Sequence, residues 1–497
     1  MDWKDEYKSK LVSAEEAVKV VKSGDRVVMP LAQSLQVLHE ELGARKDELR
    51  GVEILQGVVG ISYPWYQPGY EEAFTANFGQ YIGPLPRQLL WERRGDFTAT
   101  PYALEFKDLD ERRPGCIDPD IAMVVVSPPD ENGFCSFGES IWEKKQYVKR
   151  SKKVLAEVNE NLIRTYGDNF VHVSEIDYFV EATPYNPTPE ELEQVIAQIP
   201  PESRERMKAL FDEFKVPGHS IWATRDILFI ITPSLADMLE RTVYGAGPIP
   251  EHCHGIAHYV NQLIKDGDCI QTGTGATSNP LVRAGVFDGK HDLGFHTEVA
   301  APLIPTLVRD GLFTGKYKTL HQGKATATSF WPSSSMRQEE LDILNENPQF
   351  ELYGSEYTNN VKVISANDNM LSIQNALFVD MTGQIGVETI PGFLLQNGPG
   401  GQIDWVIGAL NSKGGRSVTV MPSTAVGGGV SRIVPLMEEG VLVTVPRTYA
   451  DFVVTEYGIA SLMGKSMRRR AEELISIAHP DSRAELKKEA QKLFYPA

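Results

Sequence analysis

Cysteine is scarce in this chain of 497 residues, and long hydrophobic runs are lacking. The four cysteines are scattered and too few for a disulfide scaffold, so we expect free thiols in a reducing compartment. No run of apolar residues reaches the length needed to cross a bilayer. The first residues, MDWKDEYKSK, carry charge where a signal peptide needs an apolar stretch. These absences predict a cytoplasmic protein without a membrane partner.

Basic residues are also in deficit, because 49 lysines and arginines face 67 aspartates and glutamates and leave a net charge of −18. Such a charge repels nucleic acid and anionic membrane surfaces, so we expect neither as a partner. The hydrophobic content of 42% and the charged content of 23% are typical of a globular protein. A chain of this length exceeds one ordinary core and predicts about two to three domains.

Short apolar runs bounded by turn residues alternate with helical patterns along the chain. The segment Ser13-Ala14-Glu15-Glu16 has the form of a capping box and predicts a helix that Gly24 ends. Continuous apolar runs of this length are typical of buried parallel strands, and their alternation with helices predicts open α/β sheets. The strands are predicted at residues 26–29, 52–58, 121–126, 154–158, 417–421 and 441–445.

A short internal repeat indicates two related halves. Residues 17–28 read AVKVVKSGDRVV and residues 260–271 read VNQLIKDGDCIQ, with Lys22 and Lys265 at matching positions. Because about half the chain separates the two copies, we predict two similar α/β domains. After the shared turn the copies differ, since only the second copy leads into a glycine loop.

The predicted boundaries give an N-terminal domain at 1–182, an insertion or bridging region at 183–250 and a C-terminal domain at 251–497. Prolines open the middle region, and two polar amphipathic patterns follow them. This region either decorates the surface or covers the active site. Its elements are predicted as helices at 190–199 and 202–214 and a strand at 226–231.

The most informative segment covers residues 271–300 and reads QTGTGATSNPLVRAGVFDGKHDLGFHTEVA. Its loop of small residues, 273–278, frees backbone N–H groups that can stabilise a developing oxyanion. Glu298, near its end, supplies a carboxylate that can attack an acyl group. The loop and the carboxylate together predict a site for acyl transfer. Three other glutamates compete for the role of nucleophile: Glu356, Glu388 and Glu456.

Two glycine clusters follow later in the chain. Residues 397–404 read NGPGGQID and residues 422–432 read PSTAVGGGVSR. Both offer backbone N–H groups to a large ligand that carries phosphates or amides, although each alone also fits an ordinary loop. The earlier pair Gly273-x-Gly275 lacks the third glycine of a dinucleotide fingerprint. A nicotinamide-dependent dehydrogenase is therefore a poor alternative.

Two further patterns have ordinary explanations. His252, Cys253, His254 and His258 resemble metal ligands, but no neighbouring cluster completes the set, so we expect no metal and a loop that enters a helix. Residues 127–133, SPPDENG, follow a predicted strand and therefore lie at the carboxyl edge of a sheet. Open α/β sheets bind ligands at this edge, although a turn stiffened by prolines fits the pattern too.

In these motifs the chain resembles the acetyl-CoA hydrolase/transferase family, the class I CoA-transferases that include 4-hydroxybutyrate and butyryl-CoA:acetate CoA-transferases. The resemblance covers most of the chain and implies two open α/β domains with an insertion between them, a homodimer, coenzyme A as co-substrate and no metal. The implied substrates are an acyl-CoA and a small carboxylic acid. The matching motifs are SPPDENGFCSFG, AEVNENLIRTYGD, HVSEID, GTG, DLGFHTE, SEYTNN, QNALFVDMTGQ, GPGGQID, VVTEYGIA and IAHP.

The resemblance also implies residue roles. The catalytic glutamate of the family falls on Glu298, its oxyanion-hole amide on Thr274, and its second oxyanion and CoA contact on Gly401. Gly429 departs from the family, because a lysine is common there, and residues 30–33 (PLAQ) stand where a glycine-rich loop is usual. The implied CoA-binding residues are Gly273, Thr274, Gly275, Ala276, Thr277, Asn375, Asn397, Gly400 and Gly401.

The implied mechanism is a ping-pong transfer of CoA between two carboxylic acids through a glutamyl-CoA thioester on Glu298. Two alternatives stay open. Water that enters the pocket would hydrolyse the intermediates and make the protein an acyl-CoA hydrolase. A CoA-binding protein without catalysis is the alternative of another class, because Gly429 removes one expected contact to CoA.

Overall fold

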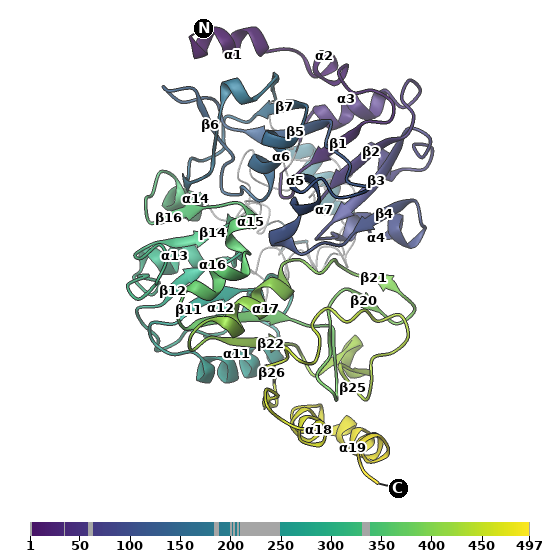
Figure 1. Ribbon diagram of the computed structural model, residues 1–497, viewed down its shortest axis with the longest axis vertical. Helices are drawn as coiled ribbons and strands as arrows, with labels where there is room; N and C mark the ends of the chain where they lie inside the picture. The colour runs from purple at the N-terminus through teal and green to yellow at the C-terminus, as the bar shows by residue number, and fades with distance from the viewer. Residues whose placement is uncertain are drawn as a thin grey trace. The chain divides into compact units, whose positions relative to one another are not determined.

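The protein is described here by a computed structural model that covers residues 2–496 with gaps at 34, 58–62, 183–187, 199–248 (except 201, 204, 205 and 208) and 331–337. The described residues form two compact units, shown in Figure 1. Those of the first unit lie within 1–100, 104–246 and 328–356, and those of the second within 101–103, 247–327 and 357–497. The domain boundaries drawn from the sequence stay predictions.

Of the insertion predicted at 183–250, the structure describes helix α7 (Pro189–Gln198), which matches the helix predicted at 190–199. Most of the second predicted helix and the strand predicted at 226–231 lie outside the described residues.

The first unit contains a parallel sheet of seven strands in the order β10-β7-β5-β1-β2-β3-β4. Every residue of β5 is buried, which explains its uninterrupted apolar sequence. The strands are β1 (Arg26–Met29), β2 (Val52–Gln56), β3 (Phe74–Gly79), β4 (Gly95–Thr98), β5 (Ile121–Val126), β7 (Lys153–Val158) and β10 (Tyr178–Glu181). Its other elements include α1 (Trp3–Lys10), α2 (Ala14–Val18), α3 (Leu38–Ala44), α4 (Pro84–Trp91), α5 (Lys107–Asp110), α6 (Lys144–Arg150), α14 (Gln338–Leu344), the antiparallel pair β6 (Phe134–Ser136) and β9 (Phe170–His172), and the parallel pair β8 (Tyr166–Gly167) and β16 (Phe350–Leu352).

Seven strands of the second unit pair in the order β27-β26-β22-β17-β11-β12-β14. The pairs that include β11 are parallel, and β27 is antiparallel to β26. The strands are β11 (Cys269–Thr272), β12 (Gly294–His296), β14 (Ala325–Ala327), β17 (Met370–Asn375), β22 (Arg416–Val420), β26 (Phe452–Thr455) and β27 (Gly458–Ser461). The helices of the second unit include α11 (Glu251–Leu263), α12 (Ser278–Arg283), α13 (Ile304–Arg309), α16 (Val361–Ala366), α17 (Gln402–Asn411), α18 (Met467–Ser476) and α19 (Pro480–Phe494). Three smaller sets of paired strands accompany the main sheet. They are β18 (Phe378–Asp380) with β19 (Ile385–Gly386) and β25 (Ile433–Val434), β20 (Thr389–Ile390) with β21 (Leu394–Leu395), and β23 (Thr424–Ala425) with β24 (Val430–Ser431).

The internal repeat of the sequence forms the same turn in both units. The backbone N–H of Lys22 donates to Oδ2 of Asp25 at 2.8 Å, and that of Lys265 donates to Oδ2 of Asp268 at 2.7 Å. The glycine within each turn, Gly24 or Gly267, has a positive φ of 84° or 78°, which glycine adopts without strain. Each turn leads into the strand from which its sheet extends in both directions. The prediction of two α/β folds is thus confirmed at this local level.

Most predicted elements lie where the sequence placed them, with two corrections. Ser13 caps α2 by accepting a hydrogen bond from the N–H of Glu16 at 3.2 Å, but the helix ends at Val18, several residues before Gly24. The strand predicted at 441–445 is wrong. There, the ladder among the described residues is a single isolated bridge from Val445 to Ile385, and Val443 is 39% exposed.

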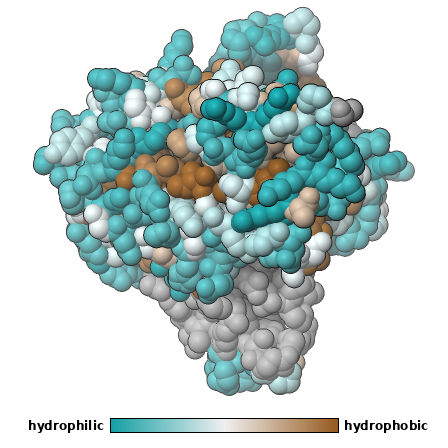
Figure 2. Space-filling model, turned by 90° about the horizontal axis from the view of Figure 1, so that it is seen from below, coloured by the Kyte–Doolittle hydropathy of each residue, from teal (hydrophilic) through white to brown (hydrophobic). Residues whose placement is uncertain are grey.

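The surface is mainly hydrophilic on the face that Figure 2 shows, with a band of hydrophobic residues across it. Buried apolar side chains from the sheets and their helices form the cores. Among the described residues, no helix combines the length and the apolar character that a membrane span needs.

Candidate active site

Three segments of the second unit meet at the carboxyl edge of its sheet. Strand β11 has β12 on one side and β17 on the other, so the order of strands along the chain reverses at β11. In open α/β sheets such a reversal leaves a crevice at the carboxyl ends of the strands, where ligands bind. The predicted glycine loop follows β11, Glu298 follows β12, and Asn375 is the last residue of β17. The topology therefore gathers these predicted residues.

Asn375 holds the glycine loop. Its Oδ1 accepts a hydrogen bond from the N–H of Ser278 at 3.1 Å, and its Nδ2 donates to the carbonyl of Thr274 at 3.3 Å. A Cβ atom at Gly273 would lie 2.8 Å from the carbonyl oxygen of Ile373, and one at Gly275 would lie 2.9 Å from Nδ2 of Asn375. Both glycines are therefore needed for the loop to pack on β17. Ala276 and Thr277 complete this loop before α12 begins.

Glu298 is 3% exposed, and two side chains hold one of its carboxylate oxygens. Nδ2 of Asn359 donates to Oε2 at 2.5 Å, and Nε1 of Trp405 donates to the same oxygen at 3.3 Å. Burial removes the carboxylate from water, and the two donors fix its orientation. The contacts of Asn359 and Trp405 with Glu298 were not predicted from the sequence. Asn359 does belong to the quoted motif SEYTNN, whereas Trp405 directly follows GPGGQID.

Gly401 approaches the carboxylate directly at the start of α17. A Cβ atom at position 401 would overlap both Oε2 of Glu298 and Nδ2 of Asn359. Gly400, immediately before it, has a positive φ of 53°. The first backbone N–H groups of a helix lack partners within the helix and carry a partial positive charge. The start of α17 can therefore stabilise negative charge next to Glu298.

The start of α17 is also joined to the glycine loop. Nε2 of Gln402 donates to the carbonyl of Asn375 at 3.1 Å, and Asn375 in turn holds the loop. Asn397 lies just before the helix, where its Oδ1 accepts from the N–H of Gly398 at 2.9 Å. The predicted residues Glu298 and Gly401 are thus in contact, and hydrogen bonds link Gly401's helix to the loop that contains Thr274.

A second carboxyl group lies close enough to interact electrostatically with Glu298. Burial, with a smaller contribution from the charge of Glu298, raises the pKa of Asp404 on α17 to about 7. An N–H bond from Ala103 at 3.3 Å opposes this rise. Near neutral pH the site therefore contains one group that exchanges its proton.

The competing glutamates have other partners. Glu388 accepts from Oγ1 of Thr444 at 2.7 Å, and Glu456 accepts from the N–H and the hydroxyl of Ser423 at 2.9 and 2.6 Å. Glu356 belongs to the first unit and accepts from Gln146. Of the four candidates, Glu298 is the one against which Gly401 packs.

The histidines and cysteine at 252–258 lie on α11, which begins at Glu251, so the expected loop before the helix is wrong. Burial raises the pKa of the Cys253 thiol to about 12 and keeps it protonated, which disfavours metal binding. Within the described ranges, no group of three or more histidine, cysteine or acidic side chains is arranged to hold a metal ion.

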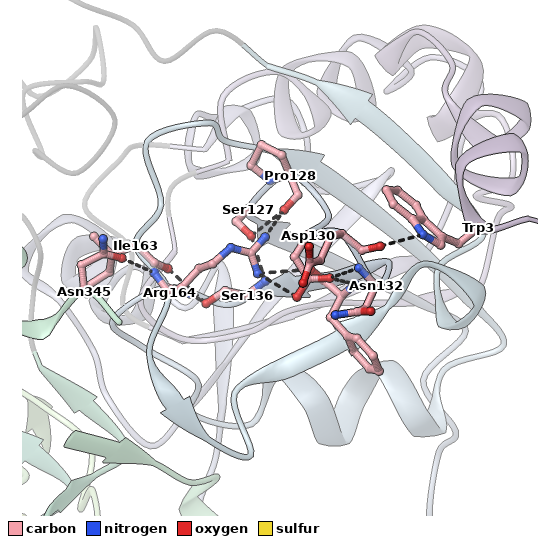
Figure 3. A network of polar contacts seen from close by, with 12 residues as sticks. Trp3, Ser127, Pro128, Asp130, Asn132, Ser136, Ile163, Arg164 and Asn345 are labelled. Atoms are coloured by element: carbon pink, nitrogen blue, oxygen red, sulfur yellow. Dashed lines mark hydrogen bonds and ion pairs between the residues drawn. The ribbon is translucent and has the colours of Figure 1, made fainter. Parts of the chain in front are cut away.

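Residues 127–133 form the loop between β5 and β6 in the first unit, and Figure 3 shows the polar contacts around it. The segment follows β5 at the carboxyl edge of the sheet, as predicted. Oδ1 of Asp130 accepts from the N–H groups of Asn132 and Phe134, both at 2.9 Å, and Arg164 donates to the carbonyl of Pro128 at 2.6 Å. Trp3 donates to the carbonyl of Glu131 at 3.2 Å. These contacts stabilise the loop itself, so they favour the turn over a ligand site.

Comparison with known proteins bears on the family of the chain and on its fold. The acetyl-CoA hydrolase/transferase N-terminal domain matches residues 1–189, and the C-terminal domain of the same family matches residues 337–490. A 4-hydroxybutyrate coenzyme A transferase from Clostridium kluyveri is 35% identical over 495 residues, which cover 99% of this chain and 100% of that protein. A butyryl-CoA:acetate CoA-transferase from Anaerostipes caccae is 32% identical, with coverage of 99% and 98%. The crystal structure of RipA from Yersinia pestis matches with a TM-score of 0.78, 27% identity and 99% coverage of both chains.

Proposed function

The chain belongs to the acetyl-CoA hydrolase/transferase family and is a CoA-transferase, and from this premise we propose that it moves CoA between an acyl-CoA and a free carboxylic acid through a thioester on Glu298. One observation carries the proposal. The carboxylate of Glu298 is buried, is held by Asn359 and Trp405, and lies against Gly401 at the start of a helix. A desolvated, oriented carboxylate beside N–H donors is suited to attack an acyl group.

The first half of the reaction loads Glu298. Its carboxylate attacks the thioester carbonyl of the acyl-CoA, the carbon–sulfur bond breaks, and CoA leaves as the thiolate with the electron pair. The product is a mixed anhydride between the side chain and the acyl group. The thiolate then attacks the side-chain carbonyl of Glu298 and releases the first acid as a carboxylate. CoA is now bound to Glu298 as a thioester.

The second half reverses these steps with another acid. The acceptor carboxylate attacks the glutamyl thioester and displaces CoA thiolate, which forms a new mixed anhydride. The thiolate attacks the acyl carbonyl of this anhydride, which yields the new acyl-CoA and restores the carboxylate of Glu298. No oxidant, reductant or net proton is required.

Each attack passes through a tetrahedral oxyanion that needs hydrogen-bond donors. For attack on the substrate carbonyl, the donors that we propose are the backbone N–H groups of Thr274 and Gly401. For attack on Glu298 itself, Asn359 and Trp405 already donate to Oε2, the oxygen on which charge would develop. Loss of one donor of this kind typically raises the barrier by about 3–4 kcal/mol.

The glycine loop and the start of α17 are the proposed CoA contacts. Glycines let the ligand approach the backbone closely, and helix N-termini favour negative groups. The position at a strand-order reversal supports this assignment. The residues proposed to bind CoA are Gly273, Thr274, Gly275, Ala276, Thr277, Asn375, Asn397, Gly400 and Gly401. A homodimer in the cytoplasm stays a prediction of the family resemblance and the sequence.

Hydrolysis is the second candidate, because the family that matches the chain includes hydrolases. Both covalent intermediates react with water, so transfer requires that water be excluded from the pocket. A hydrolase would release free CoA steadily from acyl-CoA without an acceptor acid. A transferase would stop after one equivalent of the first acid is released per active site.

The covalent intermediate gives a direct test. The protein is incubated with acetyl-CoA or butyryl-CoA without an acceptor and then treated with borohydride, which reduces a glutamyl thioester to an alcohol. We expect mass spectrometry to find the alcohol at position 298. The Glu298→Ala variant should show neither the modification nor transfer, whereas Glu388→Gln, a control at another buried glutamate, should keep both. Modification of a different glutamate, or transfer by Glu298→Ala, contradicts the proposal.

A further inference from the structure

His296 is a fully buried histidine two residues before Glu298, at the end of β12. Its Nε2 lies 3.0 Å from the carbonyl oxygen of Thr358, and its Nδ1 lies 2.7 Å from Oγ1 of Thr326. Burial lowers the pKa of His296 to about 3, so the ring is neutral near neutral pH. A neutral imidazole has one donor nitrogen and one acceptor nitrogen.

The partners of the ring decide which nitrogen carries the proton. The Thr358 carbonyl can only accept, so Nε2 carries the proton and donates to it. Nδ1 must then accept, and the hydroxyl of Thr326 is the donor. That hydroxyl is itself oriented by Lys318, whose Nζ lies 3.1 Å from Oγ1 of Thr326 and can only donate. The bonds thus run in one direction, from Lys318 through Thr326 and His296 to Thr358.

Thr358 links these bonds to the proposed nucleophile, because its carbonyl bonds to His296 and its hydroxyl bonds to Asn359. Oγ1 of Thr358 donates to Oδ1 of Asn359 at 3.1 Å, which fixes the orientation of the Asn359 amide. With its oxygen held by Thr358, the amide points Nδ2 at Oε2 of Glu298, 2.5 Å away. A displacement of the Thr358 backbone would therefore displace the donor that holds Glu298.

His296 also contacts the second donor. The centroids of its ring and the Trp405 ring lie 5.5 Å apart, with an interplanar angle of 56°. Trp405 donates to Glu298 through Nε1. One side chain therefore packs on the Trp405 ring and also bonds to Thr358, the residue whose hydroxyl donates to Asn359.

We propose that His296 is a positioning residue, which fixes Asn359 and Trp405 so that both donors point at Oε2 of Glu298. This inference rests on the proposed role of Glu298 and adds a requirement to it: a donor that reaches the Thr358 carbonyl from position 296. A side chain that only fills the core would not meet this requirement. Without the donor, the buried Thr358 carbonyl would lose the hydrogen bond from position 296, and the backbone that sets the Thr358 hydroxyl against the Asn359 amide would be less firmly fixed.

Two variants of equal chemistry and different length test the requirement. The Nε2 amide of His296→Gln lies near the position of the imidazole Nε2 and can donate to Thr358, whereas the shorter amide of His296→Asn cannot reach it. We measure the single-turnover rate of glutamyl-CoA formation, the KM for acyl-CoA and Tm. We expect His296→Gln to stay within threefold of the wild-type rate and His296→Asn to lose at least tenfold, with KM changed less than threefold in both.

A buried histidine of the first unit supplies the control. His39 is 5% exposed, and its substitution by asparagine or glutamine should lower Tm without changing the rate per folded molecule. Equal rates in His296→Gln and His296→Asn, whether both high or both low, would overturn the proposal. Absence of glutamyl-CoA in the wild type would instead overturn the proposed role of Glu298, so the two failures are distinguishable.

Variants of Thr358 test the same proposal if the variants at position 296 do not fold. Thr358→Val preserves the shape of the side chain but removes the hydroxyl that donates to Asn359, and Thr358→Ser keeps that hydroxyl. We expect the valine variant to form glutamyl-CoA at least tenfold more slowly than the serine variant at similar KM. Matching rates in the two variants would overturn the proposed path from His296 to Glu298.

Discussion

Gly401 packs so closely against Glu298 that a single methyl group at position 401 would overlap Oε2 of the carboxylate. The same methyl group would overlap Nδ2 of Asn359, the amide that donates to this oxygen. Since α17 begins with the next residue, the contact places the helix N-terminus beside the carboxylate. The contact explains why only glycine fits at this position, and it joins two residues that lie far apart in the sequence.

Replacement of Gly401 by alanine should therefore slow transfer strongly. The added methyl group must displace either Glu298 or Asn359, and a small misplacement of a reacting group costs about a hundredfold in rate. We expect at least this loss in kcat for Gly401→Ala, measured by exchange between butyryl-CoA and acetate. The matched control is Gly429→Ala, because a Cβ there meets only the Val426 carbonyl, at 3.4 Å. An active Gly401→Ala enzyme would contradict the proposed site.

Replacement of Trp405 by phenylalanine tests the second donor to Glu298. The phenyl ring keeps most of the buried volume but lacks the N–H that donates to Oε2. A hydrogen bond to a charged group contributes about 1.5–3 kcal/mol, and the low end of this range corresponds to roughly tenfold. We expect glutamyl-CoA to form about tenfold more slowly in Trp405→Phe, as followed by rapid-quench mass spectrometry. An unchanged rate, with Tm also unchanged, would show that Trp405 does not stabilise the oxyanion.

Asp404 should make stability depend on pH. Burial raises its pKa from the ordinary value of 3.8 to about 7, so the folded protein binds a proton that the unfolded chain releases between these values. Well below pH 3.8 the carboxyl is protonated in both the folded and the unfolded state, so its ionisation does not lower the free energy of unfolding. As pH rises towards about 7, the unfolded state gains from ionisation that the folded state resists, so stability falls.

The variant Asp404→Asn removes this proton and keeps an oxygen that can accept the N–H bond from Ala103. Its Tm should exceed that of the wild type more at pH 8 than at pH 4.5, as measured by differential scanning calorimetry at both values. Other buried carboxyls titrate in both proteins and cancel in the difference between them. A difference in Tm that does not change with pH would contradict the raised pKa of Asp404.

The elements and site residues that could be predicted from the sequence are those that depend on a local pattern of residues. Short apolar runs predict β1, β5 and β22, and the glycines at 273 and 275 mark a loop after β11 because no other residue lets the backbone pack on β17. Glu298 and Gly401 come from motifs that the family resemblance identifies, and the fold places them in contact.

The donors to Glu298 depend instead on which strands become neighbours. Asn359 and Trp405 lie 61 and 107 positions further along the chain, and no local pattern links them to the glutamate. The strand predicted at 441–445 is wrong for the same reason, because its apolar sequence resembles that of β5 but does not show which strands lie beside it. Every residue of β5 is buried between paired strands, whereas the described part of the chain pairs 441–445 only through the bridge from Val445 to Ile385 and leaves Val443 exposed.

Gly429 offers a test of CoA binding by gain of affinity. The residue has an ordinary helical backbone, with φ of −76°, and a Cβ there would meet the Val426 carbonyl oxygen at 3.4 Å, an ordinary van der Waals contact, so a lysine fits without backbone strain. In a pocket that binds the phosphates of CoA nearby, the new ammonium group should form one charge-assisted hydrogen bond. We expect Gly429→Lys to lower the Kd for CoA about three- to tenfold, roughly 1 kcal/mol, as measured by isothermal titration calorimetry. The gain in affinity should shrink at high salt, because ions screen an exposed pair of charges.

The control is Gly429→Gln, which adds a long side chain without charge and should bind CoA as the wild type does. If the lysine and glutamine variants bind equally, the loop at 422–432 lies away from the phosphates, and the proposed CoA site must be confined to the glycine loop and the start of α17.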